Sequence, residues 1–133
     1  MRLKSKNETG PSKRILLIED DALVRKSMTL FMASMGYEVL AADSGERGLQ
    51  VLDRERVDLM VADYQLPGIT GIEVVRTLRQ RGIQIPVVLM SADLNEETEA
   101  LAQSEQVSAV VKKSTDQLQQ LKPTLLTLLH HPS

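Results

Sequence analysis

Carboxylates follow two apolar runs of this chain, at the points where each run would end as a buried strand. Glu19, Asp20 and Asp21 come directly after residues 15–18, and Asp63 follows a second apolar run. In an open parallel sheet, ligands bind beyond the carboxyl ends of the strands, where the strand order reverses. If these two strands are neighbours, at least three carboxylates converge there, and they repel one another unless a hard cation lies among them. Oxygen ligands suit Mg²⁺, and a carboxylate held beside Mg²⁺ can act as a nucleophile toward a phosphoryl group.

Strands and helices alternate in a pattern that would position these groups. Near-continuous apolar runs predict five strands that are buried on both faces, at residues 14–18, 37–42, 57–62, 85–90 and 107–111. Amphipathic stretches between these runs predict five helices. Five such units joined by short loops imply an α/β fold, in which helices cover both faces of a parallel sheet.

Capping residues mark the expected helix boundaries. Gly36 ends the first helix, Ser44 caps the second, Thr70 or Gly71 opens the third, and Asn95 caps the fourth. The last helix is expected from about residue 115 to residue 129, and Pro123 lies inside its pattern. Because an interior proline removes a hydrogen bond at a cost of about 3 kcal/mol, a kink or break is predicted near residues 120–122.

The composition is that of an ordinary globular protein and excludes several classes of function. The 133 residues suit one domain, with 42% hydrophobic and 26% charged residues. Aromatic residues make up only 2% and the net charge is −2, so neither a stacking platform nor a basic surface for nucleic acid is expected. The chain has no cysteine, which excludes disulfides and thiolate metal sites.

The ends of the chain give expectations about location and domain limits. No apolar run approaches the roughly 20 residues of a membrane span, and the N-terminus lacks the apolar core of a secretory signal. The expected location is therefore the cytoplasm, without membrane insertion. Residues 1–13 are polar and basic and are expected to form a flexible tail or linker, followed by a single domain at 14–131.

Four motifs at the expected strand ends resemble those of receiver domains of two-component response regulators. They are Ile-Leu-Leu-Ile-Glu-Asp-Asp at 15–21, Asp-Tyr-Gln-Leu-Pro-Gly at 63–68 with Gly71 following, Val-Leu-Met-Ser-Ala at 88–92, and Val-Val-Lys at 110–112. The resemblance covers residues 14–129, and the set in this order is much more specific than any one motif. It implies a doubly wound, flavodoxin-like α/β fold, with a five-stranded parallel sheet in the order 2-1-3-4-5 flanked by five helices.

The resemblance also implies roles for individual residues in phosphoryl transfer. Asp63 would accept a phosphoryl group from a phosphohistidine of a sensor histidine kinase or a phosphotransfer protein. Ser91 would be the switch hydroxyl, and Lys112 would bind the phosphoryl oxygens. Gln65 and Asp93, each two residues after a site residue, would flank the phosphoryl group and modulate its lifetime. Such a domain would promote only its own phosphorylation and dephosphorylation, so it is not classed as an enzyme.

The same resemblance implies a metal site among these residues. Glu19, Asp20 and Asp63 would bind Mg²⁺ together with the backbone carbonyl of Gln65, and Mn²⁺ is the alternative cation. Asp20 would be a more direct ligand than Glu19. Asp21 is the better candidate for a plain helix cap, since aspartate is favoured at that position.

Two positions depart from the usual pattern of the family. Lys113 follows Lys112 where the family has a proline joined by a cis peptide. A cis bond before a non-proline residue costs about 2.5–4 kcal/mol, so a trans bond is predicted here. Ala109 stands three residues before Lys112, where the family has an aromatic residue that rotates on activation. Coupling between Ser91 and the far surface would then depend on shifts of the backbone and the helices, or it would be weak.

Output is expected through protein contacts. The predicted surface comprises the fourth helix, the fifth strand and the fifth helix, which would bind a downstream protein or a second copy of the chain. Few residues follow the last helix, so no output domain is expected in this chain, and His130 and His131 are given no role. No direct contact with nucleic acid is expected.

The sequence bears on three alternative functions. A phosphohydrolase related to the haloacid dehalogenases would carry a second aspartate where Gln65 stands. A nucleotide-binding protein would need a glycine-rich turn after the first strand, and acidic residues occupy that turn. A degenerate receiver that only binds partners stays open because of Lys113 and Ala109.

Overall fold

The computed structural model describes residues 12–129, in which strands and helices alternate strictly along the chain. The expected tail at 1–13 and the expected end of the domain at 131, with His130 and His131, lie wholly or largely outside the described residues. The elements are β1 (Arg14–Ile18), α1 (Ala22–Ser34), β2 (Glu38–Ala42), α2 (Gly45–Arg54), β3 (Leu59–Asp63), α3 (Gly71–Gln80), β4 (Val87–Ser91), α4 (Glu96–Ser104), β5 (Ala109–Lys112) and α5 (Gln117–Leu129).

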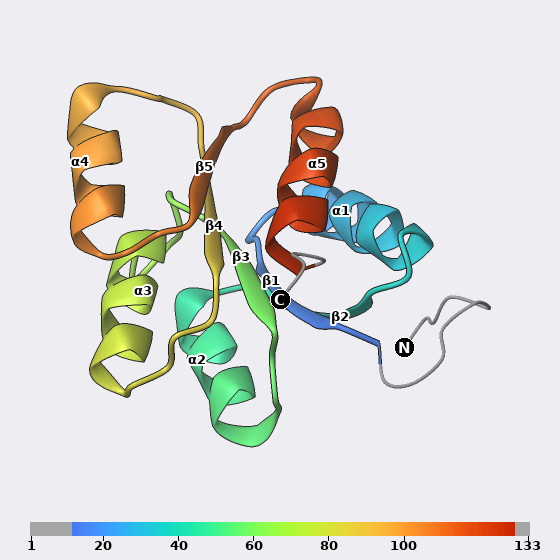
Figure 1. Cartoon of the computed structure of the whole chain (residues 1–133), viewed down its shortest axis with the longest axis horizontal. Coiled ribbons are helices and arrows are strands. Elements are labelled where there is room, and N and C mark those ends of the chain that lie inside the picture. The colour runs from blue at the N-terminus through green and yellow to red at the C-terminus, as the bar shows by residue number, and fades with distance from the viewer. Residues whose placement is uncertain (1–11, 130–133) are drawn as a thin grey trace.

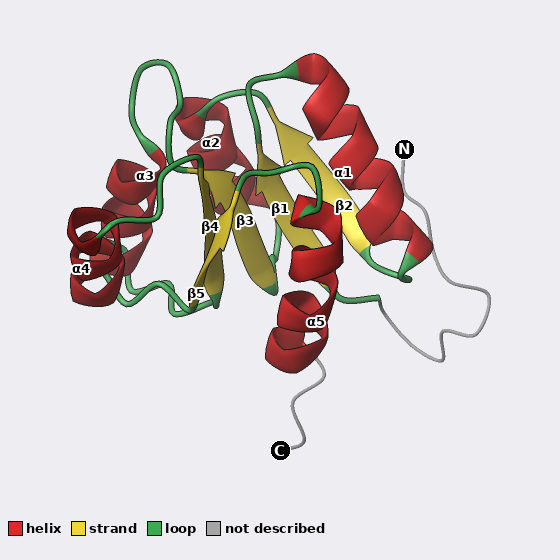
Figure 2. Cartoon of the chain, turned by 90° about the horizontal axis from the view of Figure 1, so that it is seen from above, coloured by secondary structure: helices red, strands yellow, loops and turns green. Residues whose placement is uncertain are grey.

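The five strands form one parallel sheet in the order β2-β1-β3-β4-β5 (Figure 1). Helices α1 and α5 cover one face, and α2, α3 and α4 cover the other (Figure 2). The order reverses between β1 and β3, which start the two halves of the sheet. This architecture confirms the predicted doubly wound α/β fold and its strand order.

Alternation along the strands divides the core into two layers. In β1, Ile15 and Leu17 pack with Met28 and Leu121 beneath α1 and α5. Leu16 and Ile18 face the other layer, which includes the buried residues Val74, Val75 and Leu78 of α3. Because both faces are covered, the strands contain almost only aliphatic residues.

The predicted caps are confirmed at the helix ends that the structure describes. The side chains of Ser44 and Asn95 accept backbone N–H groups at the starts of α2 and α4, and Thr70 forms a capping box with Glu73 at α3. Gly36 has a φ of 98°, a left-handed conformation that glycine tolerates at the end of α1.

The predicted break near residues 120–122 is wrong, because α5 is one continuous helix from Gln117 to Leu129, and the alternative of a kink stays a prediction. Leu121 and Leu125 are both fully buried, on either side of the proline. Their packing against the sheet outweighs the local cost of the missing N–H group, as tertiary contacts often do for short helices.

The starts of β1, β2 and β3 are joined by Arg14. Its side chain donates to Glu38 at 2.8 Å, to Glu55 at 2.8 Å and to the carbonyl of Arg56 at 3.0 Å. The backbone N–H of Arg14 donates to Asp58 at 2.8 Å. One residue thus connects three adjacent strands at the edge of the sheet where they begin.

Arg79 joins the segments that lead into β4 and β5. Its guanidinium donates to the carbonyls of Ile83 at 3.0 Å, Ile85 at 2.8 Å and Gln106 at 2.8 Å. Gln106 has a φ of 60°, which a residue with a side chain adopts at some energetic cost. Burial lowers the pKa of Arg79, which stays well within the charged range.

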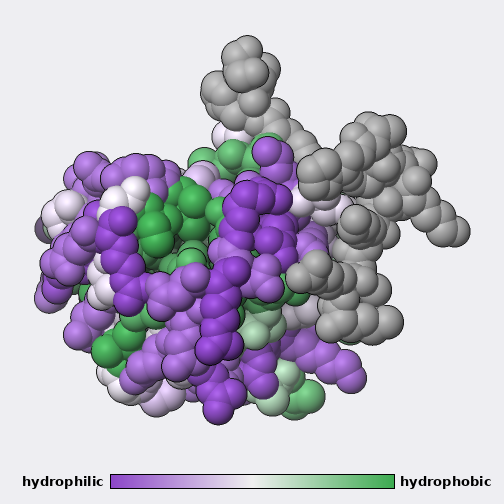
Figure 3. Space-filling view, turned by 90° about the horizontal axis from the view of Figure 1, so that it is seen from below, coloured by the Kyte–Doolittle hydropathy of each residue, from purple (hydrophilic) through white to green (hydrophobic). Residues whose placement is uncertain are grey.

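Residues 12–129 contain no helix that is long and apolar enough to cross a membrane. The face of the molecule in Figure 3 is covered mainly by hydrophilic side chains, with smaller hydrophobic areas between them.

Candidate functional site

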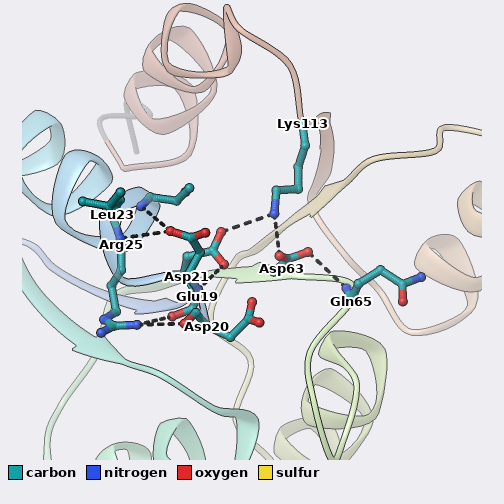
Figure 4. A network of polar contacts seen from close by, with 9 residues as sticks. Glu19, Asp20, Asp21, Leu23, Arg25, Asp63, Gln65 and Lys113 are labelled. Atoms are coloured by element: carbon teal, nitrogen blue, oxygen red, sulfur yellow. Dashed lines mark hydrogen bonds and ion pairs between the residues drawn. The ribbon is translucent and has the colours of Figure 1, made fainter.

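Three carboxylates meet where β1 and β3 end side by side. Ile18 of β1 pairs with Ala62 of β3, so the residues that follow them, Glu19 and Asp63, lie next to each other. One carboxylate oxygen from each of Glu19, Asp20 and Asp63 lies within 4.8 Å of the others (Figure 4). Glu19 and Asp63 are 2% and 5% exposed, whereas Asp20 is exposed to solvent. The predicted convergence of carboxylates is therefore present in the structure.

This donor set fits a hard divalent cation. Mg²⁺ binds oxygen ligands at about 2.0–2.1 Å, so ligands on opposite sides of the ion are about 4 Å apart. Three oxygens that lie within 4.8 Å of one another need only small side-chain movements to reach the separations of an octahedral shell. The exposed position of Asp20 leaves one side of the cluster open to water, which Mg²⁺ usually retains. Glu19, Asp20 and Asp63 would hold the ion.

Gln65 lies in the loop that leaves Asp63. Its backbone N–H donates to Asp63 Oδ1 at 3.1 Å, which fixes one oxygen of the carboxylate. The proposed ligand atom, the Gln65 carbonyl oxygen, belongs to the same residue, and its role as a ligand stays a prediction.

The lysine that reaches Asp63 is Lys113, which corrects the prediction of Lys112. The Nζ atom of Lys113 lies 2.6 Å from Asp63 Oδ2 and 3.4 Å from Glu19 Oε1 (Figure 4). Lys112 is the last residue of β5, where it pairs with Ser91, and its side chain is exposed. The sequence placed the end of the fifth strand at residue 111, one residue too early. The prediction of Lys112 rests on its match to the Val-Val-Lys motif of the family. In the structure β5 includes Lys112, whose side chain is exposed, and Lys113 follows the strand.

In the structure, Ser114 follows the lysine that faces Asp63, and Val110 lies three residues before it. The departures from the family pattern at Lys113 and Ala109 stay predictions. All peptide bonds among residues 12–129 are trans, as predicted for the Lys112–Lys113 bond.

Ser91 ends β4, the strand next to Asp63, and it is 3% exposed. Its hydroxyl donates to the backbone carbonyl of Asp93 at 2.9 Å and accepts the Asp93 N–H at 3.3 Å. The hydroxyl is therefore bound within its own loop in this structure. The side chain of Asp93 is exposed beside it.

Burial and charge shift the pKa values of two groups in the cluster. Burial raises the pKa of Glu19, and the neighbouring charge of Asp63 adds to this, while the Asp21 N–H and Lys113 oppose it. Burial alone would lower the pKa of Lys113, but its hydrogen bond to Asp63 and the charges of Asp63 and Glu19 raise it overall. Lys113 is therefore an ammonium ion that neutralises part of the acidic cluster.

The affinity for Mg²⁺ should decrease as the pH falls. This decrease should begin at a higher pH than the pH at which an ordinary glutamate takes up a proton. The raised pKa means that the folded, metal-free protein keeps a proton on Glu19 to a higher pH, and the ion must displace that proton. Calorimetric titration with Mg²⁺ at several pH values would measure the loss, and Glu19→Gln should flatten the dependence. A wild-type affinity that does not change with pH over this range would contradict the role of Glu19.

Two contacts in the site were not found from the sequence. Arg25 of α1 donates to the backbone carbonyls of Glu19 at 2.9 Å and Asp20 at 3.3 Å, although neither its residue type nor its spacing had suggested a role. Gly71 approaches the backbone of β3 so closely that an added Cβ would lie 2.3 Å from the carbonyl oxygen of Asp63. Gly71 was part of a motif, but its contact with Asp63 is a tertiary feature that no local pattern encodes.

Comparison with known proteins gives a consistent result. A family model described as "Response regulator receiver domain" matches residues 15–124. The "Transcriptional regulatory protein AfsQ1" of Streptomyces coelicolor is 46% identical over 78 residues, which are 59% of this chain and 34% of that protein. The "Cell cycle transcriptional regulator CtrA" of Caulobacter vibrioides is 38% identical over 78 residues, again 59% of this chain and 34% of that protein. The aligned region thus spans about a third of each of these relatives.

Solved structures of similar fold cover most of the chain. The response regulator protein TrrA of Thermotoga maritima, solved in complex with Mg(2+)-BeF, has a TM-score of 0.79 and 27% identity, covering 88% of this chain and 99% of that one. The chemotaxis response regulator CheY4 of Vibrio cholerae has a TM-score of 0.83 over 90% of this chain and 100% of that one. At 21% identity, the latter similarity supports the fold alone.

Proposed function

Because this chain belongs to the response regulator receiver domain family, we propose that it is a signalling switch in which Asp63 accepts a phosphoryl group. The family consists of signalling domains of two-component systems. The observation that carries the proposal is the cluster in which Glu19, Asp20 and Asp63 converge and Lys113 reaches Asp63 at 2.6 Å. This cluster combines a nucleophile, a cation site and a fixed positive charge.

The proposed reaction transfers a phosphoryl group from a phosphohistidine of a histidine kinase or phosphotransfer protein. An oxygen of the Asp63 carboxylate attacks phosphorus, the P–N bond breaks, and the imidazole leaves with its electron pair and takes up a proton. Positioning and charge neutralisation supply most of the catalysis in such transfers. Bound Mg²⁺ would neutralise charge on the phosphoryl oxygens, and the Lys113 ammonium would bind one of them. The Gln65 N–H holds Asp63 Oδ1 and so orients the carboxylate.

The proposed switch acts through Ser91. A phosphoryl oxygen on Asp63 competes for the Ser91 hydroxyl, which would leave its bond to Asp93 and draw the β4–α4 loop toward the site. The α4–β5–α5 surface would then change its affinity for a downstream protein or a second copy of the chain. Val110 offers no large side chain to rotate, so the change would be carried by the backbone. We place this activity in the cytoplasm, with Gln65 and Asp93 modulating the phosphoryl lifetime.

Incubation with acetyl phosphate and Mg²⁺ should add the mass of one phosphoryl group to the protein. Intact-mass spectrometry would detect this gain, which should vanish with EDTA and in Asp63→Asn. The mutant keeps the size of the side chain but removes the charged nucleophile, whereas Asp43→Asn changes an exposed aspartate on the β2–α2 loop and should leave the gain intact. A wild-type protein that gains no mass from acetyl phosphate or from a phosphorylated histidine protein would contradict the proposal.

A further inference from the structure

Arg25 is bound to the main chain of two of the proposed metal ligands. Its Nη1 atom donates to the carbonyl oxygen of Glu19 at 2.9 Å and to that of Asp20 at 3.3 Å. Figure 4 shows its guanidinium at the opposite end of the cluster from Lys113. Arg25 comes from the start of α1, so its side chain reaches back along the loop that joins β1 to α1.

The two carbonyls belong to the peptide units on either side of the Asp20 Cα atom. Because each peptide unit is planar, a donor that binds both carbonyls restricts both backbone dihedrals of Asp20. Neighbouring contacts fix the ends of the loop, since the Glu19 N–H donates to Ala42 at 3.0 Å and the Asp21 side chain caps α1. Asp20 itself is exposed, so its direction depends on the backbone more than on packing.

We propose that Arg25 is a positioning residue for the Mg²⁺ site, which directs the Asp20 carboxylate toward Asp63 before the ion arrives. The inference rests on the proposed function, because it concerns the same metal site. Groups that orient metal ligands without touching the ion typically change metal affinity by about 10–100-fold when they are lost. Arg25 binds the main chain of both Glu19 and Asp20 and would orient them without touching the ion.

The positive charge of Arg25 would lower the affinity for Mg²⁺, whereas its hydrogen bonds would raise that affinity. A guanidinium near the cluster repels Mg²⁺, so removal of the charge alone would tighten metal binding. This repulsion is weakened by water and salt around a partly exposed side chain. The sign of the change in affinity therefore distinguishes positioning from simple electrostatics.

The test measures Mg²⁺ affinity calorimetrically in the wild type and in Arg25→Met, Arg25→Gln and Arg25→Lys. The methionine variant, which has no donor, should bind Mg²⁺ about tenfold more weakly. The glutamine and lysine variants, which keep a donor, should recover part of the loss. Arg47→Met is the matched control, because Arg47 is 71% exposed and pairs with Asp43 on the neighbouring loop, and its affinity should match that of the wild type.

A second measurement separates positioning from a general loss of stability. In the metal-free proteins, the backbone amide resonances of Asp20 and Asp21 should shift in Arg25→Met, while those of the sheet stay in place. Thermal unfolding in EDTA checks that each variant folds, and the glutamine and lysine variants carry the comparison if the methionine variant does not.

Unchanged or tighter Mg²⁺ binding in Arg25→Met would overturn the inference. A wild type that binds Mg²⁺ but accepts no phosphoryl group would refute the proposed function alone and leave the role of Arg25 standing. A wild type that binds no Mg²⁺ would overturn both.

Discussion

Replacing Lys113 with methionine should slow phosphorylation of Asp63 by about 10–100-fold, the equivalent of a lost hydrogen bond to a charged group. The Lys113 ammonium lies 2.6 Å from Asp63 and would bind a phosphoryl oxygen as negative charge builds up. Mg²⁺ binding should persist, because the substitution makes the cluster more negative. Initial rates with acetyl phosphate and calorimetric Mg²⁺ titration would measure the two effects separately.

The adjacent residue Lys112 provides the matched control. Lys112→Met removes the same charge and leaves the same side chain, but Lys112 is exposed at the end of β5, so the rate should stay close to that of the wild type. Equal losses in both variants would point to overall charge rather than to a specific contact. A larger loss in Lys112→Met would contradict the position of Lys113 in the site.

Substitution of Gly71 by alanine should destabilise the protein by about 3 kcal/mol and abolish phosphorylation of Asp63. The new Cβ would lie 2.3 Å from the Asp63 carbonyl oxygen and 3.1 Å from the Tyr64 Cα atom. Both neighbours are backbone, so they cannot turn away, and the end of β3 must shift together with the Asp63 side chain. Denaturant unfolding and the acetyl phosphate assay would measure the two effects.

Gly82→Ala is the control for this prediction. A Cβ there meets nothing within 4 Å, but Gly82 has a φ of 79°, so alanine should cost about 1 kcal/mol of backbone strain. Phosphorylation should be unaffected, because Gly82 follows α3 at the far end of that helix from Asp63. If Gly71→Ala were as stable and as active as Gly82→Ala, the close approach between Gly71 and Asp63 would be disproved.

The fold could be predicted because its signals are local and repeated. Apolar runs identified the strands, and caps such as Ser44 and Asn95 identified helix starts to within a residue. The acidic cluster could also be predicted, since parallel strands that end at one edge bring their following residues together. Predicting that Glu19 and Asp63 lie side by side required only that rule and the strand order.

The remaining features depend on contacts between distant segments. Lys112 and Lys113 are chemically identical, so only the length of β5, which is set by pairing with β4, decides which one faces Asp63. Pro123 stays within α5 because Leu121 and Leu125 are buried against the sheet. Arg25 acts on the main chain of Glu19 and Asp20, and a pattern of side-chain types does not reveal such a bond.

Two arginines make the end of the sheet where the strands begin different from the end near Asp63. Arg14 and Arg79 together connect the starts of all five strands. The strand ends near Asp63 carry, besides backbone hydrogen bonds, the ionic contacts of Lys113, which a cation or a phosphoryl group would replace. The two ends of the sheet therefore differ, because arginine side chains connect the strands at one end, while the ionic contacts at the other end involve groups that would bind a ligand. A phosphoryl group on Asp63 would therefore act first on the loops that follow the strands, such as the loop in which Ser91 is bonded to Asp93.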